Sequence, residues 1–243
     1  MTAWGSALPT LYEIETVHWW TRGMLAATQA ILEADGWRGD GALLDVGCGG
    51  GMAGVQVVAR HRIAMDLNWL ALMHTRRYPD LRLVQGSMAA LPLVPQCCAL
   101  ILALDAIDQR GVDSLAAVAG CAELLEPQGR LLVRVSAHDW IYSTYDATTG
   151  TGTRMAAATL RRIVESAGLT VRRLTYANCC LLPAAVLRRL QARWLGTPVE
   201  DDLQPPPAWL SRWLFAVLRA EAAWLRRGDL PWGLSLYCLA VKP

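Results

Sequence analysis

Lysine is almost absent from this sequence of 243 residues, and arginine carries nearly all of the positive charge. Lys242 is the only lysine, and Lys and Arg together exceed Asp and Glu by 23 − 21 = 2. The arginines are scattered, and proteins that bind nucleic acid through charge usually show a clustered basic stripe. We therefore expect no nucleic-acid partner.

Two further features are missing. The seven cysteines and four histidines form no C-x-x-C and no cluster with zinc-ligand spacing. The N-terminal residues do not show the basic and then apolar pattern of a signal peptide, and no apolar run reaches the ~18 residues of a membrane span. We expect no metal site, reduced and mostly buried cysteines, and a cytoplasmic location.

The sequence does contain the pattern of an α/β protein. Its residues are 53% hydrophobic and 18% charged, enough for a sizeable core, and its length suits one domain. From residue 41 onward, short apolar runs alternate with helical patterns, which indicates a mostly parallel sheet with helices on both faces. The predicted strands are 42–46, 61–66, 81–85, 99–104, 129–135, 170–176 and 233–241, and the predicted helices are 52–59, 69–77, 112–125 and 155–167.

Two helical additions flank this pattern. Residues 1–40 form an N-terminal cap with a helix over 11–35, the core spans 41–177, and the final strand lies within 231–243. The segment between them, 178–230, is too long for a structureless loop, so we predict a helical insert with helices at 183–194 and 208–226. Both additions should lie over the carboxyl edge of the sheet.

The insert is rich in large aromatic rings. Our first interpretation is a helical pair packed on the sheet and the cap; an apolar tunnel and a homodimer interface are alternatives. Membrane contact is disfavoured because the insert lacks lysine and carries acidic residues. The rings are Trp194, Trp209, Trp213 and Trp224, and the acids are Glu200, Asp201 and Asp202.

A glycine-rich turn follows the first predicted strand, and it fits two templates. Gly49, Gly51 and Gly54 form a G-x-G-x-x-G with Asp66 about 20 residues later, as in dinucleotide-binding folds. Asp45, Gly47, Gly49 and Gly51 form an alternative pattern, D-x-G-x-G-x-G. An acid at that position is badly placed against a pyrophosphate but well placed against an ammonium group, which favours the second template.

Three other segments make the second template specific. Gly86-Ser87-Met88 followed by Leu91-Pro92-Leu93 matches G-D-A/M-x-x-L-P-F/L, and residues 124–130 match L-L-K-P-G-G-x. Residues 15–23, Glu-Thr-Val-His-Trp-Trp-Thr-Arg-Gly, match a segment of one bacterial branch. With these motifs the chain resembles the class I, Rossmann-like S-adenosylmethionine (SAM) dependent methyltransferases, over residues 41–176 and the final strand. The resemblance implies the strand order 3-2-1-4-5-7-6.

The resemblance also implies a cofactor site for SAM, with S-adenosylhomocysteine as product. The glycine turn would hold the methionine part, Asp66 the ribose, Leu67 and the backbone N–H of Met88 the adenine, and Arg22 the cofactor's carboxylate. The full set is Arg22, Asp45, Gly47, Cys48, Gly49, Gly51, Asp66, Leu67, Ser87, Met88 and Leu104. Two positions depart from the family pattern: Ser87 replaces an acid that would bind the adenine amino group, and Gln109 replaces a histidine.

The acceptor should lie beyond the carboxyl ends of the fourth and fifth strands. Residues 136–146 are dense in polar and aromatic groups there, and His138 has the side-chain chemistry of a general base. Tyr142, Tyr145 and Asp146 are further catalytic candidates. His18 with the two following tryptophans forms either a substrate lid or a packed helix face, and Asn178 either caps the insert or touches substrate.

These observations predict methyl transfer from SAM to a small, largely apolar acceptor at O, N or C, as a step of small-molecule biosynthesis. Methyl transfer from a sulfonium relies on alignment of the reacting atoms, so no strong catalytic motif is required. Three alternatives stay open: a non-catalytic scaffold that binds a partner through the Trp-rich insert, an NAD-dependent oxidoreductase that uses the first template, and a rearrangement or cyclisation on the same fold.

Overall fold

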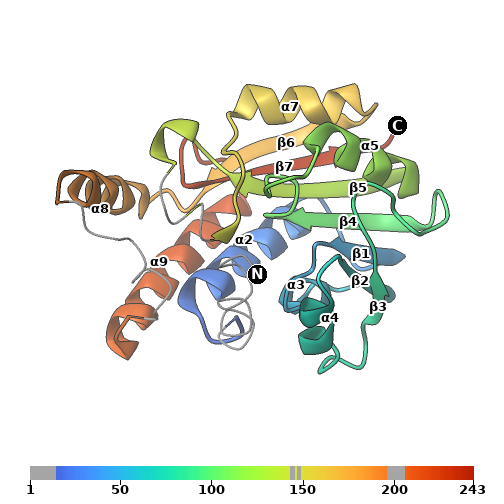
Figure 1. The fold of residues 1–243 in the computed structure, drawn as a ribbon, viewed down its shortest axis with the longest axis horizontal. Helices are drawn as coiled ribbons and strands as arrows, with labels where there is room; N and C mark the ends of the chain where they lie inside the picture. The colour runs from blue at the N-terminus through green and yellow to red at the C-terminus, as the bar shows by residue number, and fades with distance from the viewer. Residues whose placement is uncertain (1–14, 143–145, 147–148, 196–205) are drawn as a thin grey trace.

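The computed structural model describes residues 15–142, 146, 149–195 and 206–243. A seven-stranded sheet runs through the centre of the molecule, with helices above and below it (Figure 1). Its strands are β1 (Ala42–Val46), β2 (His61–Asp66), β3 (Arg82–Gln85), β4 (Cys98–Leu104), β5 (Leu125–Ser136), β6 (Thr170–Ala177) and β7 (Ser235–Val241).

The strand order is β3-β2-β1-β4-β5-β7-β6, which confirms the predicted order. Strand β7 is antiparallel to both β5 and β6, and the other neighbouring strands pair in parallel. Parallel strands end at the same edge of a sheet. The carboxyl ends of β1, β2, β4 and β5 therefore lie together, and this edge holds the candidate site.

Helices cover both faces, as predicted, because the central strands are apolar on both sides. Leu44, Ile101 and Val133 pack toward α5 (Ser114–Leu124) and α7 (Ala157–Ser166). Leu43 and Leu132 pack toward the opposite face. The helices of that face are α2 (Trp19–Ala34), α3 (Met52–Gln56), α4 (Trp69–Thr75) and α9 (Ala208–Leu225), and α8 (Leu182–Leu195) precedes α9 in the insert.

Helix α3 is shorter than predicted, since it ends at Gln56 rather than residue 59. The chain becomes extended at Val57, whose ψ angle is 125°, and the carbonyls beyond the helix bond to side chains: Val57 accepts from Arg62 Nε at 3.3 Å and Val58 accepts from Trp37 Nε1 at 2.8 Å. At the N-terminal side, α2 begins at Trp19, and residues 15–17 form a turn.

The predicted cap and insert pack against each other as α2 and α9, which lie side by side in Figure 1. A Cβ atom on Gly23 would collide with Leu218, so a glycine is needed where the two helices cross. Tyr237 on β7 donates a hydrogen bond to the carbonyl of Met24 at 3.0 Å and lies 2.9 Å from Thr28 Oγ1. The cap helix α2 and the insert helix α9 therefore pack side by side, and α2 is bonded to the final strand, β7.

Helix α9 of the insert packs on the cap, and three tryptophans of the insert lie on its exposed side. Trp209, Trp213 and Trp224 are 71%, 58% and 58% exposed. The reason is that α9 buries a different stripe against the cap and sheet, formed by Leu218, Glu221, Ala222 and Leu225. The Trp194 side chain lies outside the described part. No helix in the described ranges is long and apolar enough to cross a membrane.

Candidate functional site

The glycine turn after β1 bends sharply before α3. Gly47 and Gly49 have φ angles of +68° and +53°, a region that side chains with a Cβ rarely adopt. A Cβ on Gly47 would also lie 2.8 Å from Ala106 Cβ. The backbone N–H groups of Gly47 and Cys48 donate to the carbonyl of Met65 at 2.8 and 3.0 Å, which fixes the turn against β2.

Two acids at the ends of β1 and β2 hold the same turn. Asp45 Oδ2 accepts from Gly54 N at 2.9 Å, and burial raises the pKa of this carboxyl to about 7. Asp66 accepts from Gly49 N at 3.0 Å and from Asn68 N at 2.8 Å. Burial also raises the pKa of Asp66, although those N–H groups oppose the shift. The pair of acids thus positions both sides of the glycine turn.

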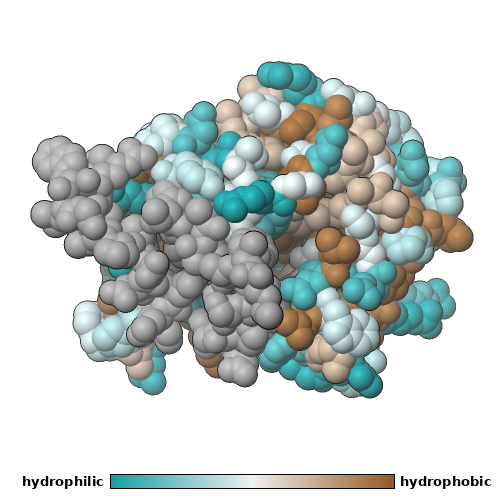
Figure 2. Space-filling view, viewed as in Figure 1, coloured by the Kyte–Doolittle hydropathy of each residue, from teal (hydrophilic) through white to brown (hydrophobic). Residues whose placement is uncertain are grey.

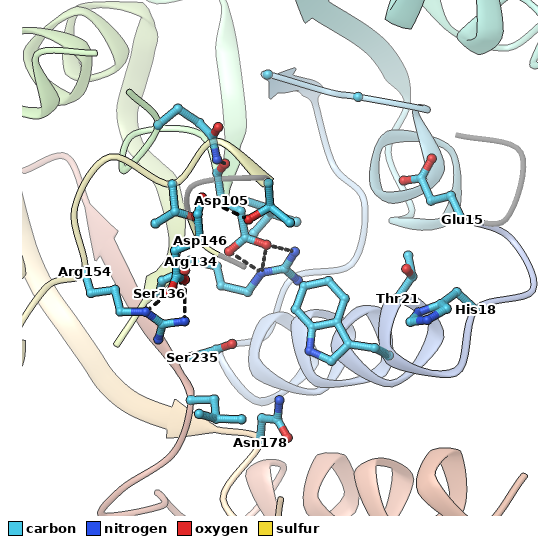
Figure 3. Close-up of a pocket in the computed structure, with 18 of the residues that line it drawn as sticks. Glu15, His18, Thr21, Asp105, Arg134, Ser136, Asp146, Arg154, Asn178 and Ser235 are labelled. Carbon is cyan, nitrogen blue, oxygen red and sulfur yellow. Dashed lines mark hydrogen bonds and ion pairs between the residues drawn. The ribbon is translucent and has the colours of Figure 1, made fainter. Parts of the chain in front are cut away.

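A cavity of about 390 Å³ opens beside this turn. It extends from the glycine turn past the ends of β4 and β5 to the segment before α7 and the start of the insert (Figure 3). Small-molecule sites commonly occupy roughly 300–1,000 Å³. The described lining residues are Glu15, His18, Trp20, Thr21, Gly47, Cys48, Gly49, Gly50, Leu104, Asp105, Gln109, Arg134, Ser136, Asp146, Thr149, Thr151, Arg154, Asn178, Arg189, Leu234 and Ser235.

A smaller cavity of about 70 Å³ lies behind the turn. Asp45, Thr28 and Met52 line this space but not the larger cavity. Glu15 and Arg134 line both. Asp45 is therefore set back from the larger cavity, and Glu15 is the carboxyl that reaches it from the cap.

An arginine–aspartate pair stands at the centre of the larger cavity. Arg134 on β5 donates from Nη2 to Asp105 Oδ2 at 2.6 Å and from Nε to the same carboxylate. Its Nη1 donates to the Tyr237 hydroxyl at 3.3 Å. Burial lowers the pKa of Arg134, but Asp105 more than reverses this, so the guanidinium stays charged. We did not predict this pair from the sequence. The available signal was Arg134, an arginine between two apolar residues of β5.

A second ionic group closes the far end of the cavity. Asp146 Oδ1 accepts from Arg154 Nη2 at 2.6 Å and from Nε at 3.0 Å, and both side chains are buried. Arg189 of α8 lies 3.9 Å from Asp146 Oδ2 and donates to the carbonyl of Ile141. Asp146 was predicted as a catalytic residue; it does line the cavity, with its carboxylate held by two guanidiniums.

His138 and Tyr142 are not among the described residues that line the cavity. The His138 ring stacks on Tyr176 with centroids 5.3 Å apart. Burial lowers the pKa of this imidazole. The Tyr142 hydroxyl donates to the carbonyl of Thr151 at 3.0 Å. Tyr145 lies outside the described residues.

The predicted cofactor residues separate into two groups. Gly47, Cys48, Gly49 and Leu104 line the larger cavity. Arg22 does not, because its guanidinium lies 4.2 Å from the centroid of the Phe215 ring on α9. The structure therefore does not bring Arg22 to the position that the resemblance implied for it.

Gly51 and the residues predicted for the adenine lie outside both cavities. Gly51 begins α3 against Thr75, where an added Cβ would touch the Thr75 methyl group. Ser87 Oγ accepts from Ala89 N at 3.1 Å, and Met88 packs on the core. Leu67 is 69% exposed at the end of β2, next to the exposed apolar residues of α4. Figure 2 shows apolar patches over this part of the surface.

An apolar groove of about 360 Å³ adjoins the larger cavity, between the start of α2 and the helices α8 and α9. His18, Trp20 and Asn178 line both spaces. The predicted lid residue His18 thus lies at the junction. Arg188 and Arg189 also line the groove, and its apolar members are Trp19, Trp20, Leu181, Ala184, Ala185, Pro206, Leu210, Leu214 and Leu234.

Asn178 does not cap the insert, but it lines both the larger cavity and the apolar groove, so its predicted contact with substrate stays a prediction. Helix α8 begins four residues later, and Glu221 of α9 accepts from the backbone N–H groups of Cys179 and Cys180 at 3.1 and 2.7 Å. Asn178 has a φ angle of +61°, and its buried Oδ1 has no hydrogen-bond partner in the described structure. It therefore presents an unsatisfied acceptor at the junction.

No group of three or more His, Cys, Asp or Glu among the described residues could hold a metal ion.

Comparison with models of protein families and with curated protein sequences finds no match. Solved structures do match. One is a SAM-dependent methyltransferase from Thermotoga maritima, with 13% identity, a TM-score of 0.60, and 99% of this chain and 100% of that chain covered. A second is a TehB-like SAM-dependent methyltransferase from Corynebacterium glutamicum, with 15% identity, a TM-score of 0.55, and coverage of 90% and 88%.

A third is geranyl diphosphate methyltransferase in complex with SAM, with 15% identity, a TM-score of 0.58, and coverage of 89% and 85%. These identities are too low to carry a substrate across. The structural matches concern the fold, which in this chain has the strand order given above, a glycine turn at the end of β1 and helices on both faces. The chain has the fold of the class I, Rossmann-like SAM-dependent methyltransferases.

Proposed function

We propose that this protein transfers a methyl group from SAM to an O, N or C atom of a small, largely apolar acceptor. The observation that carries the proposal is one cavity that joins the glycine turn to the ends of β4 and β5 and adjoins an apolar groove. When bound, SAM supplies a methyl group on a sulfonium, which a nucleophile can take by in-line displacement.

The residues present fit such a cofactor. The backbone of the turn at Gly47 and Gly49 borders the cavity. The buried Glu15 Oε2 atom lacks a hydrogen-bond partner in the described structure. Asp66 accepts from Gly49 N and Asn68 N, and the two oxygens of a carboxylate together offer about four lone-pair sites, so they can also accept from hydroxyl groups. In this proposal Asp66 binds the ribose, and Leu67, Ser87 and Met88 contact the adenine.

The acceptor would enter from the side of the insert. Its apolar part would lie in the groove against Leu210 and Leu214, and its nucleophilic atom would lie in the larger cavity. Polar groups at the junction, such as Asn178 and Ser235, would orient it. Alignment of acceptor and methyl group is the main contribution that these walls make to the rate.

Calorimetric titration with S-adenosylhomocysteine tests the cofactor part. We expect saturable binding of one molecule per chain and an increase in melting temperature, since a ligand of the folded state stabilises it. NADH, followed by its fluorescence, should not bind. Binding of NADH without binding of S-adenosylhomocysteine would favour the oxidoreductase instead.

A matched pair of variants tests the acceptor part. Leu214→Asp places a charge in the groove, whereas Ala216→Asp places the same charge on the exposed face of α9. With radiolabelled SAM and a panel of apolar alcohols, amines and acids, Leu214→Asp should raise KM for the acceptor while Ala216→Asp should not. Neither should change the affinity for S-adenosylhomocysteine.

The exposed tryptophans of α9 favour one alternative, a surface that binds a partner or a second copy of the chain. Sedimentation of the wild type and of a Trp209→Ser, Trp213→Ser double variant tests it. A dimer that the double variant abolishes would support an interface there, whether or not the protein is an enzyme.

A further inference from the structure

Glu15 lies at the glycine-turn end of the cavity, and the motif-based site did not include it. It comes just before α2 and lines both the larger and the smaller cavity. In Figure 3 it stands near Thr21 and His18, on the opposite side of the pocket from Arg154 and Asp146. Glu15 therefore belongs to the part of the cavity where the proposed function places the cofactor.

The carboxyl of Glu15 is buried and incompletely satisfied. Its Oε2 atom has no hydrogen-bond partner in the described structure, and no ion pair to Glu15 occurs among the described residues. A buried polar atom without a partner has lost its hydrogen bonds to water and destabilises the ligand-free protein. Such an atom in the wall of a cavity is a natural contact for a ligand that donates a hydrogen bond.

Several charged groups surround this carboxyl. Burial and, to a smaller extent, the Asp45 carboxyl on β1 raise its pKa to about 7. Arg77 after α4, the backbone N–H of Met52 on α3, and Arg134 on β5 oppose the shift. Arg134 is already bonded to Asp105. Among the described residues no side chain forms an ion pair with Glu15 within 4.0 Å.

We infer that Glu15 is the carboxylate that binds the ammonium group of the amino-acid end of the cofactor. The inference rests on the proposed function and changes the earlier assignment of this contact to Asp45. Asp45 is bonded to Gly54 and lines only the smaller cavity, whereas Glu15 also reaches the larger one. A bound ammonium would satisfy Oε2 and reduce the repulsion between the two acids.

Binding of a cation next to Glu15 should release protons near pH 7. Glu15 is partly protonated in the free protein at this pH, and a neighbouring ammonium favours its charged form. Asp45, whose pKa is also about 7, contributes part of the release. The Cys48 thiol does not, because burial raises its pKa far above neutrality.

The test compares the wild type with Glu15→Gln and with Glu165→Gln, which makes the same change at an exposed position of α7. Each protein is titrated with S-adenosylhomocysteine near pH 7 in two buffers of different ionisation enthalpy, which gives affinity and proton release together. We expect Glu15→Gln to bind about tenfold or more weakly, as for one lost charge-assisted hydrogen bond, and to release fewer protons. Glu165→Gln should match the wild type.

Methylthioadenosine, which lacks the amino-acid end, separates a local contact from damage to the fold. The wild type and Glu15→Gln should bind it equally. Wild-type affinity and proton release in Glu15→Gln would overturn the inference, and so would an equal loss of methylthioadenosine binding. If the wild type binds S-adenosylhomocysteine not at all, the proposed function itself fails, which is a distinct result.

Discussion

Asp66 Oδ2 accepts a hydrogen bond from the backbone N–H of Gly49 at 3.0 Å, so the acid that ends β2 is bonded to the glycine turn that follows β1. The two sequence motifs are separated by 17 residues, and the parallel pairing of β1 and β2 brings them into contact. Asp66 therefore has two tasks: it would bind the ribose, and it already shapes the turn.

The first prediction concerns Asp66. Asp66→Ala should weaken binding of S-adenosylhomocysteine by more than ~1 kcal/mol, the scale of a hydrogen bond to a charged group, because both the ligand contact and the Gly49 bond are lost. Calorimetry measures this change. Asp80→Ala, at an exposed position after α4, is the control. Unchanged affinity in Asp66→Ala would contradict the assignment.

The second prediction concerns pH and stability. Burial raises the pKa values of Glu15, Asp45 and Asp108 to about 7, whereas in the unfolded chain they lie near 4. Between pH about 4 and pH about 7 these carboxyls therefore bind more protons in the folded state than in the unfolded state. The free energy of unfolding should therefore be highest at low pH within this window and fall as pH rises through about 7, by roughly 2 kcal/mol or more.

Urea unfolding of the ligand-free protein from pH about 5 to about 8 measures this fall. Glu15→Gln should make the fall shallower because one of the three carboxyls is removed. A free energy of unfolding that rises over this range would show that these acids are charged and paired in the folded protein.

The third prediction concerns the ion pair between Arg134 of β5 and Asp105, which follows β4. Arg134→Met should lower the free energy of unfolding by roughly 3 kcal/mol, because it leaves Asp105 without its guanidinium and Tyr237 without a donor. Arg161→Met, which breaks an exposed pair with Glu165, should cost less than about 0.5 kcal/mol. Equal effects of the two substitutions would contradict the structural role of Arg134.

The fourth prediction concerns His138 as a general base. The stacking of its ring on Tyr176, away from the described cavity lining, leads us to expect that His138→Ala lowers kcat by less than about tenfold. A decrease of a hundredfold or more, with KM unchanged, would restore the role that the sequence suggested. The measurement requires an acceptor identified with radiolabelled SAM.

Much of the fold could be predicted because it depends on local pattern. The bounds of β1 and β2 agree with the structure, and α4, α7 and α8 differ from prediction by one or two residues. The early end of α3 was not predicted: the chain becomes extended at Val57, and the carbonyl of Val58 then accepts from Trp37 Nε1, 21 residues away in the sequence. Such a contact leaves no periodic trace in the sequence.

The site was predictable where a motif encodes backbone shape, as at Gly47 and Gly49. It was not predictable where side chains from distant segments meet. Arg22 appeared suitable for the cofactor because arginine binds carboxylates, yet α9 supplies Phe215 on that side of α2 and takes up the guanidinium. Glu15 begins the matched segment 15–23 but received no predicted role, because its position in the cavity wall becomes visible only in the fold.

The hydrogen bond from Tyr237 to the carbonyl of Met24 joins residues that are 213 positions apart. During synthesis on the ribosome, α2 leaves the exit tunnel before the strands of the sheet, and α9 and β7 follow β6. Domains fold as their segments become available. The side of α2 that packs on α9 therefore stays uncovered until α9 has emerged, and the part of the cavity wall at Leu234 and Ser235 forms only when β7 is made.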